Sequence, residues 1–79
     1  MQIRAEFTVY PFREGQDPPP DYVQAAIGAL TAAGMDVEVG LLGQIVTGEA
    51  AEVLEALRAA EQAALDAGAT RVAVNVELA

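Results

Sequence analysis

Hydrophobic and polar residues alternate strictly along residues 2–10, which is the period of a strand with one buried and one exposed face. Pro11 interrupts the pattern, so we expect the strand to end there. The two faces of this strand carry Ile3, Ala5, Phe7 and Val9 on the apolar side and Arg4, Glu6, Thr8 and Tyr10 on the polar side.

Three further segments have the character of strands. Residues 35–39 and residues 71–78 alternate in the same way, and residues 41–47 follow a tight turn centred on Gly40. In residues 41–47 the apolar side chains occupy both odd-numbered and even-numbered positions, so the pattern does not decide which face of this strand is buried.

Two segments instead have the helical period. Within residues 22–33 the apolar residues recur at intervals of three and four, and residues 49–67 carry a similar stripe. We expect Gly34 and Gly68 to end these helices in a left-handed conformation. Asp21 is the expected N-cap of the first helix, although a helix that starts at a proline would move the cap to Asp17.

The resulting order is β-α-β-β-α-β, with residues 12–20 as a proline-rich loop. Right-handed crossovers then place both helices on one face of a four-stranded antiparallel sheet. We therefore predict an α+β ferredoxin-like sandwich, with residues 1–79 forming a single domain. The other face of the sheet is left open and polar.

Composition narrows the range of functions. The 79 residues carry a net charge of -8, and the four arginines are scattered, which argues against a nucleic-acid partner. The chain contains no cysteine and no histidine, so we expect no disulfide, no metal site of the usual kind and no cofactor. No apolar stretch or leader sequence suggests membrane insertion or export, so we expect a cytoplasmic protein.

The alanine-rich core is small, and we expect the chain to self-associate. If another subunit covers the open sheet face, Thr8, Tyr10 and Asn75 can form a small-molecule site there. The plainer alternative is that these residues are solvated, or that they serve only an interface between subunits.

Three segments resemble the YkoF-like and related thiamine-binding proteins. They are residues 6–12 (EFTVYPF), residues 43–48 (GQIVTG) with the glutamates that follow, and residues 73–76 (AVNV). The resemblance extends over the chain as a single repeat. Gln44 stands where the family usually has a small hydroxyl residue, and Thr47 stands at a position that is often charged.

This resemblance implies a non-enzymatic module that binds thiamine or its hydroxymethylpyrimidine half, works as a homodimer or homotetramer and is linked to uptake of these compounds. Carboxylates can meet the thiazolium cation or the amino group, an aromatic ring can stack, and amide and hydroxyl groups can bond the pyrimidine edge. The ligand-binding residues that we expect on this basis are Glu6, Thr8, Tyr10, Glu38, Gln44 and Asn75.

Other classes of function share the predicted fold. ACT-like regulatory domains bind small metabolites, such as amino acids, at subunit boundaries. The carboxylate of an amino acid needs a cationic side chain nearby, and this chain has few basic residues. A small enzyme of the dimeric α+β barrel kind would have to rely on Tyr10, Asp36 and the glutamates for acid-base chemistry. A protein whose open face serves only self-association is the last alternative.

Overall fold

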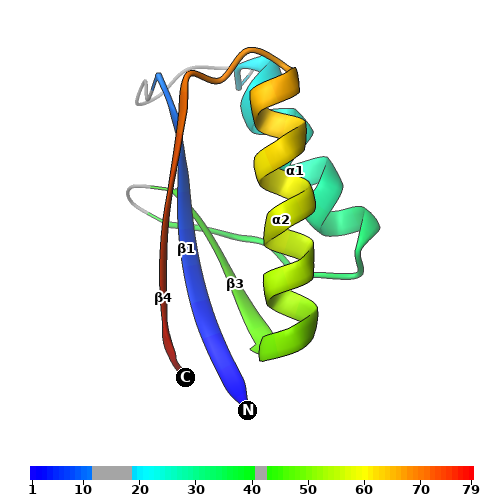
Figure 1. Cartoon of the computed structure of the whole chain (residues 1–79), viewed down its shortest axis with the longest axis vertical. Coiled ribbons are helices and arrows are strands. Elements are labelled where there is room, and N and C mark those ends of the chain that lie inside the picture. The colour runs from blue at the N-terminus through cyan, green and yellow to red at the C-terminus, as the bar shows by residue number, and fades with distance from the viewer. Residues whose placement is uncertain (12–18, 41–42) are drawn as a thin grey trace.

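A computed structural model describes residues 1–11, 19–40 and 43–79. The predicted order of elements is confirmed, and so is the ferredoxin-like α+β architecture (Figure 1). The elements are β1 (Gln2–Tyr10), α1 (Asp21–Ala32), β2 (Glu38–Val39), β3 (Gln44–Glu49), α2 (Ala50–Asp66) and β4 (Arg71–Leu78).

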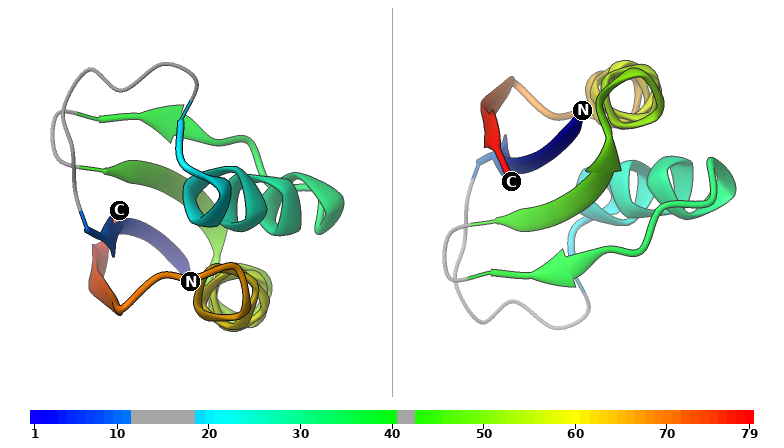
Figure 2. Two further views of the ribbon diagram at one scale, coloured as in Figure 1. Left: turned by 90° about the horizontal axis from the view of Figure 1, so that it is seen from above. Right: turned by 90° about the horizontal axis from the view of Figure 1, so that it is seen from below.

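The four strands form one antiparallel sheet in the order β2-β3-β1-β4. Both helices lie on the same side of this sheet, with α1 beside its β2–β3 half and α2 beside its β1–β4 half (Figure 2). The described elements therefore leave the second face of the sheet uncovered. Neither of the described helices is long and apolar enough to cross a membrane.

The alternation in β1 is confirmed by burial, because the four apolar side chains of this strand are all buried beneath the helices. From α1 only Ala26 and Leu30 are fully buried, whereas α2 contributes a longer stripe that includes Val53 and Leu57. Alanines fill much of the remaining interior, so the two helices approach each other closely.

Both helices end as predicted, at glycines with positive φ: Gly34 at 83° and Gly68 at 110°. The expected cap at Asp21 is wrong, because Asp21 is the first residue of α1 and Pro20 is the N-cap. The Pro20 carbonyl accepts hydrogen bonds from the backbone N–H groups of Val23 and Gln24. The proline thus enters the helix with its fixed φ, and no side-chain cap is formed.

The strand predicted over residues 35–39 is shorter, since β2 comprises only Glu38–Val39. The reason is local: the Met35 N–H donates to the Leu30 carbonyl and closes the end of α1, so the chain is not free to pair until it has left the helix. The strand predicted over residues 41–47 pairs from Gln44 and continues to Glu49, whereas residues 41–42 lie outside the described residues. Most of the predicted loop, residues 12–18, also lies outside them.

Candidate functional site

The strand register aligns four side chains in one row across the open face of the sheet. Glu38 lies opposite Ile45, Ile45 lies opposite Glu6, and Glu6 lies opposite Asn75. Directly opposed residues in an antiparallel sheet share a face, and neighbouring strands are about 4.8 Å apart. The row therefore places two carboxylates on either side of a buried isoleucine, which is 9% exposed, followed by an amide.

The next positions along β1 extend this surface. Thr8 lies opposite Ala73, and Tyr10 lies opposite Arg71. Alternate residues of a strand are about 6.8 Å apart, so Thr8 lies within the span of a small molecule bound at Glu6, whereas Tyr10 lies about 13.6 Å along the strand from Glu6. Five of the six predicted site residues thus share the open face: Glu6, Thr8, Tyr10, Glu38 and Asn75.

The sixth predicted residue, Gln44, lies elsewhere. It is opposite Phe7 on one side and Val39 on the other, which places it on the helix-facing side of the sheet. Its Oε1 atom is buried and has no hydrogen-bond partner. The structure therefore does not bring Gln44 together with the other five residues.

Two glycines, Gly40 and Gly43, pack tightly against this surface. A Cβ atom at Gly43 would collide with the Phe7 carbonyl oxygen and lie 2.7 Å from the Thr8 hydroxyl oxygen. A Cβ atom at Gly40 would lie 2.9 Å from Cδ1 of Ile45 and 3.2 Å from a carboxylate oxygen of Glu6. These glycines lie beside Glu6 and Thr8, and the sequence analysis had identified only Gly40, as the centre of a turn.

The ring of Tyr10 already has a partner on one face. The Arg71 guanidinium lies over the ring, 4.7 Å from its centroid, in a cation–π arrangement. The Tyr10 carbonyl accepts a hydrogen bond of 2.9 Å from the Thr70 N–H. A ligand that stacks on Tyr10 must therefore use the other face of the ring or displace Arg71.

The second basic residue of the open face is also engaged. Arg4 forms a salt bridge of 3.0 Å with Glu77 across β1 and β4. With Arg71 over Tyr10 and Arg4 paired to Glu77, the charges next to Asn75 and Ile45 are those of Glu6 and Glu38. The centre of the open face therefore favours a cation or a hydrogen-bond donor over an anion.

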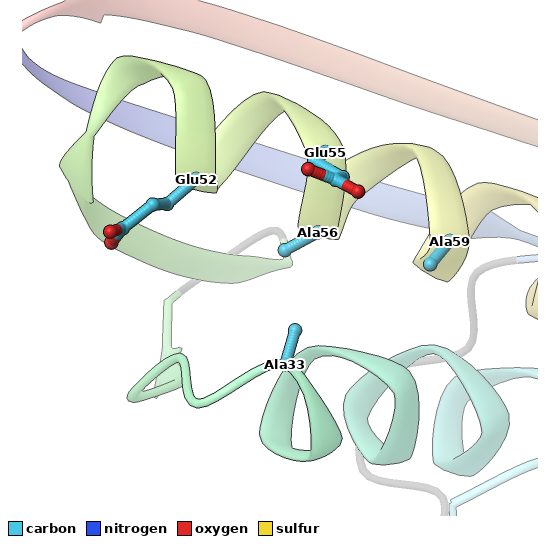
Figure 3. Close-up of a pocket in the computed structure, with 5 residues that line it drawn as sticks. All are labelled: Ala33, Glu52, Glu55, Ala56 and Ala59. Carbon is cyan, nitrogen blue, oxygen red and sulfur yellow. The ribbon is translucent and has the colours of Figure 1, made fainter.

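A depression lies in the helix layer, on the other side of the sheet from the open face, between the two helices (Figure 3). Ala33, the C-cap of α1, points toward Ala56 and Ala59 of α2, and Glu52 and Glu55 also line the depression. This depression is a consequence of alanine-to-alanine helix packing and offers no hydrogen-bond donor side chain. Among the described residues no three acidic side chains gather closely enough to hold a metal ion.

Solved structures with the same fold support this description. A DUF77 domain from Bacillus cereus superposes with a TM-score of 0.69 at 30% identity, covering 96% of this chain and 72% of that one. A protein from Thermotoga maritima, described as a candidate for thiamine biosynthesis or salvage, has a TM-score of 0.67 at 21% identity, covering 98% and 81%. The second likeness concerns the fold alone.

Sequence comparison is more specific. The UPF0045 protein of Methanothermobacter thermautotrophicus is 34% identical over 77 residues, which cover 96% of this chain and 78% of that protein. The family described as thiamine-binding protein matches residues 5–79, which include β1 from Ala5 onward and every later element. This chain belongs to the thiamine-binding protein family.

Proposed function

We propose that this protein binds thiamine, or the hydroxymethylpyrimidine half of it, without catalysing a reaction, and that the site is the open sheet face around Glu6. Family membership indicates a small-molecule ligand. The single observation that supports the position of the site is the row of Glu38, Ile45, Glu6 and Asn75 across the sheet.

The chemistry of thiamine matches the groups in this row. Its thiazolium ring is cationic, and it suits a surface where two carboxylates flank a buried isoleucine. Its aminopyrimidine carries a donor beside an acceptor, which the carboxylate of Glu6 and the amide of Asn75 complement. Tyr10 offers its remaining ring face for stacking.

Anionic and zwitterionic ligands fit this surface less well. Thiamine diphosphate needs several cationic groups, but Arg4 is paired with Glu77, and Arg71 lies over Tyr10. An amino acid, the ligand of the ACT-like alternative, needs a cation for its carboxylate in the same way. The unphosphorylated vitamin is therefore the proposed ligand.

An open sheet face encloses a ligand poorly, because a small molecule usually loses most of its exposed surface on binding. We therefore include self-association in the proposal, as a homodimer or homotetramer in which another copy helps to cover the site. In this scheme residues 1–79 form one binding unit, and the proposal includes a role in uptake of the vitamin or its precursor.

The test is isothermal titration calorimetry with thiamine, hydroxymethylpyrimidine and thiamine diphosphate in turn. We expect saturable binding of the first two and weaker or no binding of the diphosphate. Glu6→Gln should weaken thiamine binding about tenfold, because it replaces a charge-assisted contact with a neutral one. Asn75→Ala should weaken binding by a similar factor while the far-UV circular dichroism spectrum stays unchanged.

Glu55→Gln is the matched control, because it removes the same charge from an exposed position on α2, in the helix layer. It should leave the affinity for thiamine within about twofold of the wild type. Equal losses in Glu6→Gln and Glu55→Gln would contradict the position of the site. Absence of heat with both thiamine and hydroxymethylpyrimidine would contradict the proposed ligand.

A further inference from the structure

The two edges of the sheet differ sharply. The edge strand β2 comprises only Glu38–Val39, whereas the other edge strand, β4, extends over eight residues. Long edge strands are usually protected by proline, glycine bulges or charges, because their unpaired backbone groups attract other strands. β4 contains no proline or glycine, and its single arginine and single glutamate cancel in charge.

β4 also leaves apolar side chains uncovered on the helix side of the sheet. Val76 and Leu78 lie opposite Ala5 and Ile3, so they point toward the helix layer, yet they are 47% and 74% exposed. Neither helix covers these two side chains at the outer edge of the sheet. β4 therefore combines an unpaired edge of eight residues, no net charge and exposed apolar side chains on the helix side. Among the described residues, this surface is the one best suited to pairing with a further strand.

The neighbouring flank of α2 continues the apolar surface. Leu54 and Leu65 are 51% and 48% exposed. Each follows a buried residue of the helix, whereas Ala56 and Ala59 face α1 on the opposite flank (Figure 3). Leu54 and Leu65 therefore lie on the flank of α2 that faces away from α1. Because α2 lies beside the β1–β4 half of the sheet and α1 lies beside the other half, this flank is the one nearer to β4 (Figure 2).

The backbone of β4 is oriented for a further strand. The Ala79 N–H donates to the Gln2 carbonyl at 3.1 Å, and hydrogen-bonded pairs alternate along an antiparallel ladder. The odd-numbered residues of β4 consequently direct their N–H and C=O groups toward β1. Val72, Val74 and Val76 direct theirs away from β1, toward the free edge.

We propose that β4 pairs antiparallel with β4 of a second copy of this chain, about a two-fold axis at Val74, to form one continuous sheet. The residue pattern from Arg71 to Glu77 is complementary to itself about this position. Val74 meets Val74, and Val72 meets Val76 on the helix side, while Arg71 meets Glu77 of the second copy on the open face. Both strand ends then gain a pair of opposite charges.

This register satisfies the hydrogen-bonding geometry at the same time. Val72, Val74 and Val76 of one copy exchange backbone hydrogen bonds with Val76, Val74 and Val72 of the other. The side chain of Glu77 remains 66% exposed while paired with Arg4, so it is accessible to Arg71 of the second copy. A partner other than this chain would have to supply the same charge order and apolar spacing.

The two-fold axis gives a direct test, because this chain has no cysteine of its own. In a hydrogen-bonded antiparallel pair the Cα atoms lie about 5.5 Å apart, within the range of about 4.4–6.8 Å that a disulfide spans. Val74→Cys should therefore convert most of the purified full chain into a covalent dimer under mild oxidation, as seen on a non-reducing gel.

Val76→Cys is the control on the same strand face. Position 76 lies four residues from its own copy in the proposed register, so its Cα atoms are roughly 13 Å apart and should not cross-link. Val76 is nonetheless 47% exposed, so random collision would link it at least as readily as position 74. A mixture of Val72→Cys and Val76→Cys chains should form the mixed dimer.

Cross-linking of Val76→Cys equal to that of Val74→Cys would overturn the proposal, and so would the absence of a dimer with Val74→Cys. The inference concerns one surface of self-association and rests on the proposed homo-oligomer, but not on the identity of the ligand. Because pairing at β4 places the two open faces side by side, the copy that helps to cover the site belongs to a second contact, as a homotetramer allows. Light scattering distinguishes failure of this surface from failure of the proposed homo-oligomer. A monomeric wild type contradicts both proposals, whereas an oligomer without a disulfide at position 74 contradicts only the β4 surface. Circular dichroism of each variant confirms folding.

Discussion

Gln44 was assigned to the site from the sequence, but the structure places it on the helix-facing side of the sheet. Its position within the segment that resembles the family suggested contact with a ligand, but it is opposite Phe7 and Val39 on the helix side. A buried amide oxygen without a partner carries a desolvation cost that no bond offsets. This residue is therefore a candidate for stabilising substitution.

We predict that Gln44→Met raises the free energy of unfolding by about 1 kcal/mol, because it keeps the volume and removes the unsatisfied oxygen. Urea denaturation measures this change. Gln2→Met, at an exposed position of β1, should alter stability by less than about 0.5 kcal/mol.

The affinity of Gln44→Met for thiamine should equal that of the wild type, since the proposed ligand lies on the other face of the sheet. A clear loss of affinity in this variant, with the fold intact, would return Gln44 to the binding site and contradict the position proposed for it.

At the scale of elements, glycine ends both helices because of the backbone conformation and not because of crowding. A Cβ atom at Gly34 or Gly68 would contact nothing within 4 Å, yet φ is 83° at the first and 110° at the second. These turns release the chain toward β2 and β4. The same turn after α1 uses the Met35 N–H and so shortens β2.

We predict that Gly68→Ala lowers the free energy of unfolding by about 1 kcal/mol, since alanine disfavours a positive φ. Gly28→Ala is the matched control, because Gly28 lies inside α1 with nothing within 4 Å of an added Cβ. This control should instead raise the free energy by roughly 0.8 kcal/mol through helix propensity. Thermal or urea denaturation that gives both changes the same sign would contradict this account.

At the scale of the whole molecule, the net charge of -8 affects both proposals, in opposite directions. Two copies repel each other over distances comparable with the Debye length, whereas a cationic ligand is attracted. The neutral β4 edge is the part of the sheet where contact adds least to the repulsion between copies.

We predict that raising the salt concentration from about 0.1 M to about 1 M strengthens self-association and weakens thiamine binding, because the Debye length falls from about 10 Å to about 3 Å. Sedimentation velocity and calorimetry on the same samples measure the two effects, each expected to be threefold or larger. Association that weakens with salt would indicate that charge pairs, and not the apolar edge, hold the copies together.

Most of the fold was accessible from local pattern. The strands predicted from alternation, β1 and β4, and the two helices predicted from their apolar stripes were confirmed. An element that buries one face repeats apolar residues at its own period, and this period can be recognised in the sequence. The errors occurred at ends, at Asp21 and in residues 35–37, where hydrogen bonds that close a helix compete with capping and strand pairing. Local pattern does not decide that competition.

The sequence by itself determined the order of the elements, the family and the polar character of the open sheet face. Only the tertiary structure decided that Glu38, Ile45, Glu6 and Asn75 form one row, that Gln44 faces the helices, and that β4 is a long unprotected edge. The physical reason is register. Alternation fixes the face of a side chain relative to its own strand, whereas its cross-strand neighbours depend on turn geometry and on how distant segments pack.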